Sequence, residues 1–300
     1  MKIRGKFKAI NPIVPLYVLV GLLVVAVPLR TYQLLFITES DTGFYKSVNW
    51  SVYLIYGLSI LAFLVPYIMV NLAKSVPSSN NPPSRKNKIL VAASFLFGLG
   101  IVLDVISTCA TIFLDKSLVP FTERENVFPL LLEVVFGILS AIYVLIFGIS
   151  YIDGKTTFSQ YKFLALSPLV WSISRIIIRF LKRISYVNIA DLLFELIAIA
   201  FMMIFFLALA RISSGLANET SMRSLFASGY VSVFFCLVTN IPRLVVVLTG
   251  NGRLLPDEYP LALCDLFFAF FAVSYIVNAM ISAKENDSKE LLEDDIKENE

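Results

Sequence analysis

The chain has no histidine and few charged residues, and each shortage excludes a class of function. Without any His among 300 residues, His-based acid–base catalysis, Ser–His pairs and His metal ligands are excluded. Only 16% of the residues are charged, whereas soluble domains average about 25%. The formal net charge of +3 is too small to indicate nucleic-acid binding.

Cysteine is also scarce. Cys109, Cys236 and Cys264 lie far apart, and no CxxC spacing occurs. We interpret all three as small buried apolar residues. We expect neither a bound metal nor a cofactor.

Long apolar runs are what the chain has in abundance. It is 58% hydrophobic with a mean hydropathy of +0.80. Runs such as 50–73 can cross a hydrocarbon core of about 30 Å at about 1.5 Å per residue, and in lipid such runs must be helical. We therefore predict an all-α, polytopic transmembrane helical bundle of eight spans. The predicted spans lie near 12–37, 50–73, 89–114, 127–152, 162–181, 187–210, 224–249 and 259–283.

The short connections predict one transmembrane domain over residues 1–283. The acidic tail 284–300 is expected to be solvated and disordered, with a short helix around Leu291 and Leu292 as the alternative. With the N-terminus inside, 15 Lys and Arg residues fall on the inner side and 6 on the outer side. This bias predicts a multi-pass protein of the plasma membrane with both termini in the cytoplasm.

Nine ionisable residues fall inside the predicted spans. All nine lie in the half of the bilayer away from the basic end, within about 12 Å of its outer edge. Each would cost roughly 2.5–3.5 kcal/mol if inserted alone, so pairing is expected. With Asn240 added, the candidate polar cluster consists of Arg30, Asp104, Glu133, Arg175, Arg179, Asp191, Glu195, Asn240, Arg243 and Asp265.

The charged residues of spans 5 and 6 predict two ion pairs at matched depths in the membrane, which we call the ladder. Arg175 and Arg179 are four residues apart, as are Asp191 and Glu195, so each pair shares a helix face. A hairpin that turns near residues 183–186 puts Arg179 level with Asp191. The same turn puts Arg175 level with Glu195. The pattern of a basic residue in an odd-numbered span and an acidic residue in the next span recurs in spans 7 and 8. This recurrence favours tandem helical hairpins.

Five intramembrane acids face four arginines. If the ladder forms, Asp104, Glu133 and Asp265 compete for Arg30 and Arg243, and at least one carboxyl lacks a basic partner. Such a carboxyl favours a cationic or proton-linked ligand over an anionic one. As an alternative, Arg30 and Arg243 snorkel to the outer headgroups.

Several functions stay open on this pattern. The best interpretation is an outward-facing sensor, or an assembly partner of another membrane protein, with a small cationic ligand as a further option. The alternatives are a transporter of a small molecule or ion, and a salt-bridge network with a purely structural role. An enzyme is disfavoured, because Asp104 follows Gly98-Leu-Gly-Ile-Val-Leu rather than the GxGD motif of intramembrane aspartyl proteases.

Two stretches carry a resemblance to known sequences. They are Pro28-Leu-Arg-Thr-Tyr-Gln33 leading into Asp41-Thr-Gly-Phe-Tyr45, and the segment from Trp171 to Arg211. In these stretches the chain resembles multi-span membrane proteins of Gram-positive anaerobic bacteria, a group with no assigned activity. The resemblance implies a bacterial integral membrane protein and no specific role.

Overall fold

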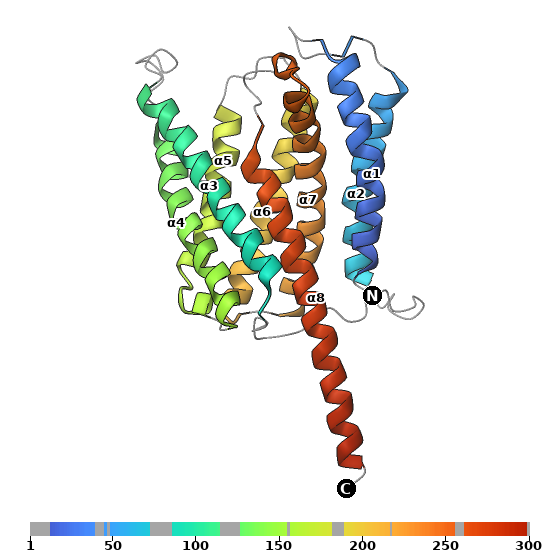
Figure 1. The fold of residues 1–300 in the computed structure, drawn as a ribbon, viewed down its shortest axis with the longest axis vertical. Coiled ribbons are helices and arrows are strands. Elements are labelled where there is room, and N and C mark those ends of the chain that lie inside the picture. The colour runs from blue at the N-terminus through green and yellow to red at the C-terminus, as the bar shows by residue number, and fades with distance from the viewer. Residues whose placement is uncertain are drawn as a thin grey trace.

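Eight helices make up the computed structural model (Figure 1), which describes residues 13–39, 45–46, 49–72, 86–114, 127–154, 157–181, 189–216, 218–255 and 261–298. The helices are α1 (Val14–Tyr32), α2 (Trp50–Leu72), α3 (Lys88–Leu114), α4 (Val127–Asp153), α5 (Ser167–Leu181), α6 (Ile189–Ser213), α7 (Glu219–Leu248) and α8 (Leu263–Glu298). All eight are long and apolar enough to cross a membrane, α5 together with the short helix before it. The predicted all-α bundle of eight spans is therefore confirmed, and the chain is a multi-pass membrane protein by the length and composition of its helices.

Short elements join or extend these helices. α1 continues without a break into the π-helix η1 (Gln33–Ile37), and 3-10 helices occupy Thr157–Gln160 (η3), Leu164–Leu166 (η4) and Gly252–Leu254 (η5). α5 has only 15 residues, or about 22 Å, so η4 completes its crossing. Over the described residues no β-strand forms, although Thr38 and Tyr45 make one isolated antiparallel bridge.

Local chemistry sets several helix ends. The side chain of Asn87 accepts hydrogen bonds from the backbone N–H groups of Ile89 and Leu90, which caps the start of α3. The last turns of α6 and α7 give way to Gly215 (φ 74°) and Gly250 (φ 77°). A left-handed backbone at these positions favours glycine and stops the helix.

The helices run side by side, and α1 begins at the same end of the bundle at which α8 leaves it (Figure 1). We call this the terminal end and the opposite one the distal end. The apolar stretches of α7 and α8 are each 67% buried, whereas that of α1 is 28% buried. α7 and α8 thus form the centre of the bundle. α1 and α2 pack against α7 at the periphery.

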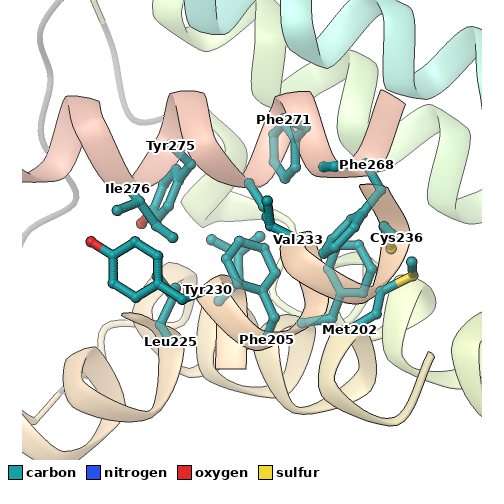
Figure 2. Close-up of a cluster of buried hydrophobic side chains, with 14 of the residues drawn as sticks. Met202, Phe205, Leu225, Tyr230, Val233, Cys236, Phe268, Phe271, Tyr275 and Ile276 are labelled. Atoms are coloured by element: carbon teal, nitrogen blue, oxygen red, sulfur yellow. The ribbon is translucent and has the colours of Figure 1, made fainter. Parts of the chain in front are cut away.

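An aromatic layer fills the middle of the bundle between α6, α7 and α8. Figure 2 shows Phe205 of α6 between the side chains of α7 and the rings of Phe268 and Phe271 of α8. The ring centroids of Phe205 and Phe268 lie 5.5 Å apart, and Phe97 of α3 lies 5.4 Å from Phe271. These rings are fully buried, so this layer is dry and closely packed.

Glycines allow the outer helices to approach this core. A Cβ atom at Gly100 of α3 would lie 2.8 Å from Phe267 of α8. A Cβ atom at Gly137 of α4 would lie 2.5 Å from Val105 of α3. Small residues at helix contacts are typical of membrane bundles, where close packing rather than water exclusion holds helices together.

The backbone of α8 continues as a helix to Glu298, well past the last residue of its apolar span, Ser282. This helix is longer than the short one considered around Leu291 and Leu292. The division at residue 283 into a membrane domain and a disordered tail stays a prediction, as do the tandem hairpins.

Candidate functional site

Several charged side chains lie near the distal end, in helix turns where the helix dipole favours their charge. Asp191 lies in the first turn of α6 and Asp265 in the first turn of α8, where the helix dipole favours a carboxylate. Arg30 lies in the last turn of α1 and Arg179 in the last turn of α5, where it favours a cation. Both helix starts and both helix ends lie at the distal side of the bundle, so opposite charges meet there.

The first network joins three arginines to the two acids of α6. Arg30 donates from Nη2 to Asp191. Arg243 of α7 lies between both acids, 3.8 Å from Asp191 Oδ2 and 2.5 Å from Glu195 Oε1. Arg179 completes the network, with its Nε 3.2 Å from Glu195 Oε2. Side chains of α1, α5, α6 and α7 are thereby tied together.

The second network is centred on Arg175 of α5. Its Nη1 donates to Asp265 of α8 at 2.7 Å, and its Nε lies 3.9 Å from Asp104 of α3. The guanidinium also lies over the ring of Trp171, 4.9 Å from the ring centroid, in a cation–π contact. α3, α5 and α8 meet at this arginine.

The predicted ladder is wrong in its register. Over the part of the chain that the structure describes, Arg175 is not paired with Glu195, and Arg179 pairs with Glu195 instead of Asp191. Side chains tilt toward the N-terminus of their own helix. In the antiparallel pair α5–α6, Arg179 therefore reaches toward the terminal end and Glu195 toward the distal end, so partners meet one turn away from the level position.

The predicted competition for Arg30 and Arg243 is also wrong. Both arginines contact the acids of α6, while Asp104 and Asp265 both contact Arg175. Snorkelling of Arg30 and Arg243 is not observed, because each is only 1% exposed.

The other two predicted residues have different surroundings. Asn240 of α7 accepts a hydrogen bond at Oδ1 from the backbone N–H of Ala262, directly before α8. Non-helical backbone at membrane depth must be bonded by the protein, so this contact secures the start of α8. Glu133 is buried on α4, one helical turn from Gly137, which approaches Trp171. Glu133 thus lies on the α4 face toward the second network.

Exposure differs within the cluster. The side chain of Asp104 is 28% exposed and that of Arg179 is 16% exposed, whereas Arg30, Asp191, Glu195, Arg243 and Asp265 are at most 4% exposed. The exposed apolar side chains of Leu103 and Ile106 flank Asp104 on α3. The second network is therefore open at one carboxylate on the outer face of α3.

Several residues of the site were not identified from the sequence. Tyr45 and Gln33 both accept from Arg30, at 2.6 and 3.0 Å, and Trp171 lies under Arg175. Spacing could have identified Trp171, which lies four residues before Arg175 on one helix. No sequence signal distinguishes Tyr45 from the other tyrosines, because it reaches Arg30 only through the path of its connecting segment.

The described residues contain no group of three His, Cys, Asp or Glu side chains that could hold a metal ion. The described cysteines are free. No family model, curated protein or solved structure matches the chain.

Proposed function

We propose that this membrane protein receives a cationic group at the distal end of its charge cluster, as an outward-facing sensor or an assembly partner. The observation that carries the proposal is the 28% exposure of Asp104 within an apolar span. An ionisable group at membrane depth is costly unless it lines a polar route or is covered by a partner. The other paired acids are sealed by protein, so Asp104 is the group an incoming cation can reach.

The charge balance favours a cation. The intramembrane set has five acids, Asp104, Glu133, Asp191, Glu195 and Asp265, against four arginines. Asp104 and Asp265 both contact Arg175. An ammonium or guanidinium group of a ligand, or of a basic side chain on a partner, would complement this side of the cluster.

The cellular setting belongs to the same proposal. The excess of Lys and Arg in the connections at the terminal end supports a plasma membrane location with that end in the cytoplasm. The distal end then faces outward. The resemblance to proteins of Gram-positive anaerobes supports a bacterial origin.

Cysteine labelling tests the proposal. In a Cys109→Ser background, we expect Asp104→Cys to react on intact cells with impermeant thiosulfonate reagents. With this variant we expect similar rates for a cationic and an anionic reagent, because Arg175 and Asp265 neutralise each other. Ser107→Cys, one turn away with Asp104 intact, should react at least about tenfold faster with the cationic reagent. The matched control for Asp104→Cys, Leu103→Cys, is its exposed apolar neighbour and should react with neither, because a thiol facing lipid does not form the reactive thiolate.

Two outcomes would contradict the proposal. If Asp104→Cys is as unreactive as Leu103→Cys, no polar route leads to the cluster. If both reagents react with Ser107→Cys at the same rate, the site has no preference for cations. Adding Asp104→Asn to Ser107→Cys should reduce the ratio of the two rates.

Transport is the second candidate, and a polar layer at the terminal end favours it. Asn278 of α8 is 1% exposed; its Oδ1 accepts from Asn87, and its Nδ2 has no hydrogen-bond partner. Tyr143 and Ser213 share a buried hydrogen bond of 2.8 Å near the same end. Polar groups thus lie on both sides of the aromatic layer, as a transport path requires, but the layer between them is closed.

The pairing also supports the structural alternative. The two networks join α1, α3, α5, α6, α7 and α8, so they help to define how six helices pack. Buried ion pairs can specify packing without adding net stability. This role is compatible with a cation at Asp104, because Asp104 lies at the edge of its network.

A further inference from the structure

Arg30 is enclosed by neighbours that leave one of its donors without a hydrogen bond. Its Nη2 pairs with Asp191, and its Nη1 donates to Gln33 Oε1 and to the hydroxyl of Tyr45. Its Nε, buried with the rest of the side chain, has no hydrogen-bond partner. The guanidinium carbon lies 5.9 Å from the centroid of the Phe194 ring. The Nε–H group of Arg30 therefore remains available as a donor, while Asp191 of α6 neutralises the charge of the guanidinium group.

Tyr45 reaches Arg30 from the connection between η1 and α2. Thr38 and Tyr45 form the isolated bridge, and Lys46 N–H donates to the carbonyl of Ile37 at 2.8 Å. The hydroxyl of Thr38 donates to the carbonyl of Gln33 at 3.0 Å. These contacts hold Tyr45 beside the end of α1. Tyr45 is partly exposed while Arg30 is buried, so the phenol covers the arginine on the distal side.

A second buried polar atom lies in the same surroundings. Gln33, which accepts from Arg30, donates from Nε2 to the carbonyl oxygen of Ser51 at 2.8 Å. The hydroxyl of Ser51 is buried and has no hydrogen-bond partner. Gln33 thus links Arg30 at the end of α1 to the backbone of Ser51 at the start of α2. A negatively charged acceptor would bind the guanidinium of Arg30 more strongly than the neutral phenol oxygen does, because both partners would then be charged.

We propose that Tyr45 caps an anion-binding site at Arg30. When Tyr45 moves away, a carboxylate or phosphate oxygen takes the position of its phenol oxygen on Nη1. The site is independent of the cation site at Asp104, because its residues lie on α1, η1 and α2 rather than on α3, α5 and α8. The anion is either a soluble carboxylate or phosphate from the distal side or the phosphate of a lipid headgroup.

Thermal unfolding of the full chain in phosphatidylcholine nanodiscs tests this site. Sodium phosphate and sodium acetate are titrated against sodium chloride at equal ionic strength. We expect one of these anions to raise the Tm of the wild type with saturation. Tyr45→Phe keeps the ring and removes the competing hydroxyl. It should lower the half-saturating concentration about tenfold or more, the equivalent of one hydrogen bond to a charged group.

Two further variants control the result. The double variant Arg30→Gln with Asp191→Asn removes one charge of each sign, leaves Arg243 paired with Glu195, and should abolish the anion dependence. Tyr53→Phe, at an exposed position on α2, should behave as the wild type.

The lipid composition distinguishes the two sources of the anion. If the ligand is a headgroup, soluble anions have no effect, and phosphatidylglycerol in the nanodiscs raises the Tm of Tyr45→Phe more than that of the wild type. The proposal is overturned if neither soluble anions nor phosphatidylglycerol distinguish Tyr45→Phe from the wild type. It is also overturned if the double variant keeps the dependence. Tyr45 would then only fasten its segment to α1.

Discussion

Asp191 and Glu195 each contact two arginines, so a single acid of α6 joins several helices. Asp191 contacts Arg30 and Arg243, and Glu195 contacts Arg243 and Arg179. In a dry interior, an arginine that loses its acid is left as a buried charge, which costs about 3–5 kcal/mol. The effect of a substitution therefore depends on which partner remains, and not only on which group is removed.

The Arg175–Asp265 pair offers the clearest test at this scale. Arg175→Gln should destabilise the protein by about 3–5 kcal/mol, because it leaves Asp265 as a buried charge. Asp265→Asn should cost less, because Arg175 keeps its contact with Asp104. The double variant should cost less than the sum, with a coupling of about 0.5–3 kcal/mol. The measurement is the free energy of unfolding of the purified protein, or the Tm where unfolding is irreversible.

The matched control uses the pair that the ladder predicted. Arg175→Gln combined with Glu195→Gln should be close to additive, because the structure pairs these residues with other partners. A stronger coupling between Arg175 and Glu195 than between Arg175 and Asp265 would contradict the observed register. The pairing of Arg175 with Glu195 that the sequence predicts would then be correct.

At the scale of elements, four of the intramembrane charges lie in terminal turns of helices, where the helix dipole favours them. Asp191 and Asp265 lie in first turns, and Arg30 and Arg179 lie in last turns. The aromatic layer lies beyond them toward the terminal end, in α6 and in the apolar span Leu263–Ser282 of α8. This order, from a charged layer to an apolar one, is the arrangement expected if the proposed reception of a cation is correct.

Accessibility scanning of α6 and α8 tests this separation. Cysteines placed along 201–210 and 273–280 should show few positions reactive from the terminal end, because the Phe205, Phe268 and Phe271 rings leave no wet route. Leu216→Cys, exposed just after α6, is the positive control. A continuous reactive stripe along either helix would favour transport over reception.

At the scale of the whole molecule, an even number of crossings puts both ends of the chain on one side. α1 begins and α8 leaves at the terminal end (Figure 1). The excess of Lys and Arg in the connections at that end predicts that it is cytoplasmic. This orientation decides whether the cluster and Tyr45 face the outside.

Labelling at two connections tests the orientation. On intact cells, Asn251→Cys, after α7 at the distal end, should react with an impermeant maleimide. Leu216→Cys, between α6 and α7, should react only after permeabilisation. The reverse pattern would show that the protein has the opposite orientation, with its distal end and charge cluster facing the cytoplasm. Reaction of both positions on intact cells would contradict the eight-span arrangement.

The sequence by itself determined the number and position of the helices and the concentration of charge at one end. The position of the helices and the position of the charges along them can be read from consecutive residues. An apolar run forms a membrane-spanning helix regardless of which other helices pack against it. The predicted spans begin within five residues of the observed helices, with the largest differences at α5 and α7, whereas α8 continues well past its predicted end at residue 283.

Only the tertiary structure decided which charge meets which. The contacts of Arg175 with Asp265 and of Arg30 with Asp191 and Tyr45 join segments far apart in the chain. They depend on the rotation of each helix about its axis and on the tilt of side chains toward its N-terminus. The depth of a residue in the membrane gives neither the rotation of its helix nor the tilt of its side chain. Matching residues by depth therefore predicted the wrong partner for Arg179 and could not identify Tyr45.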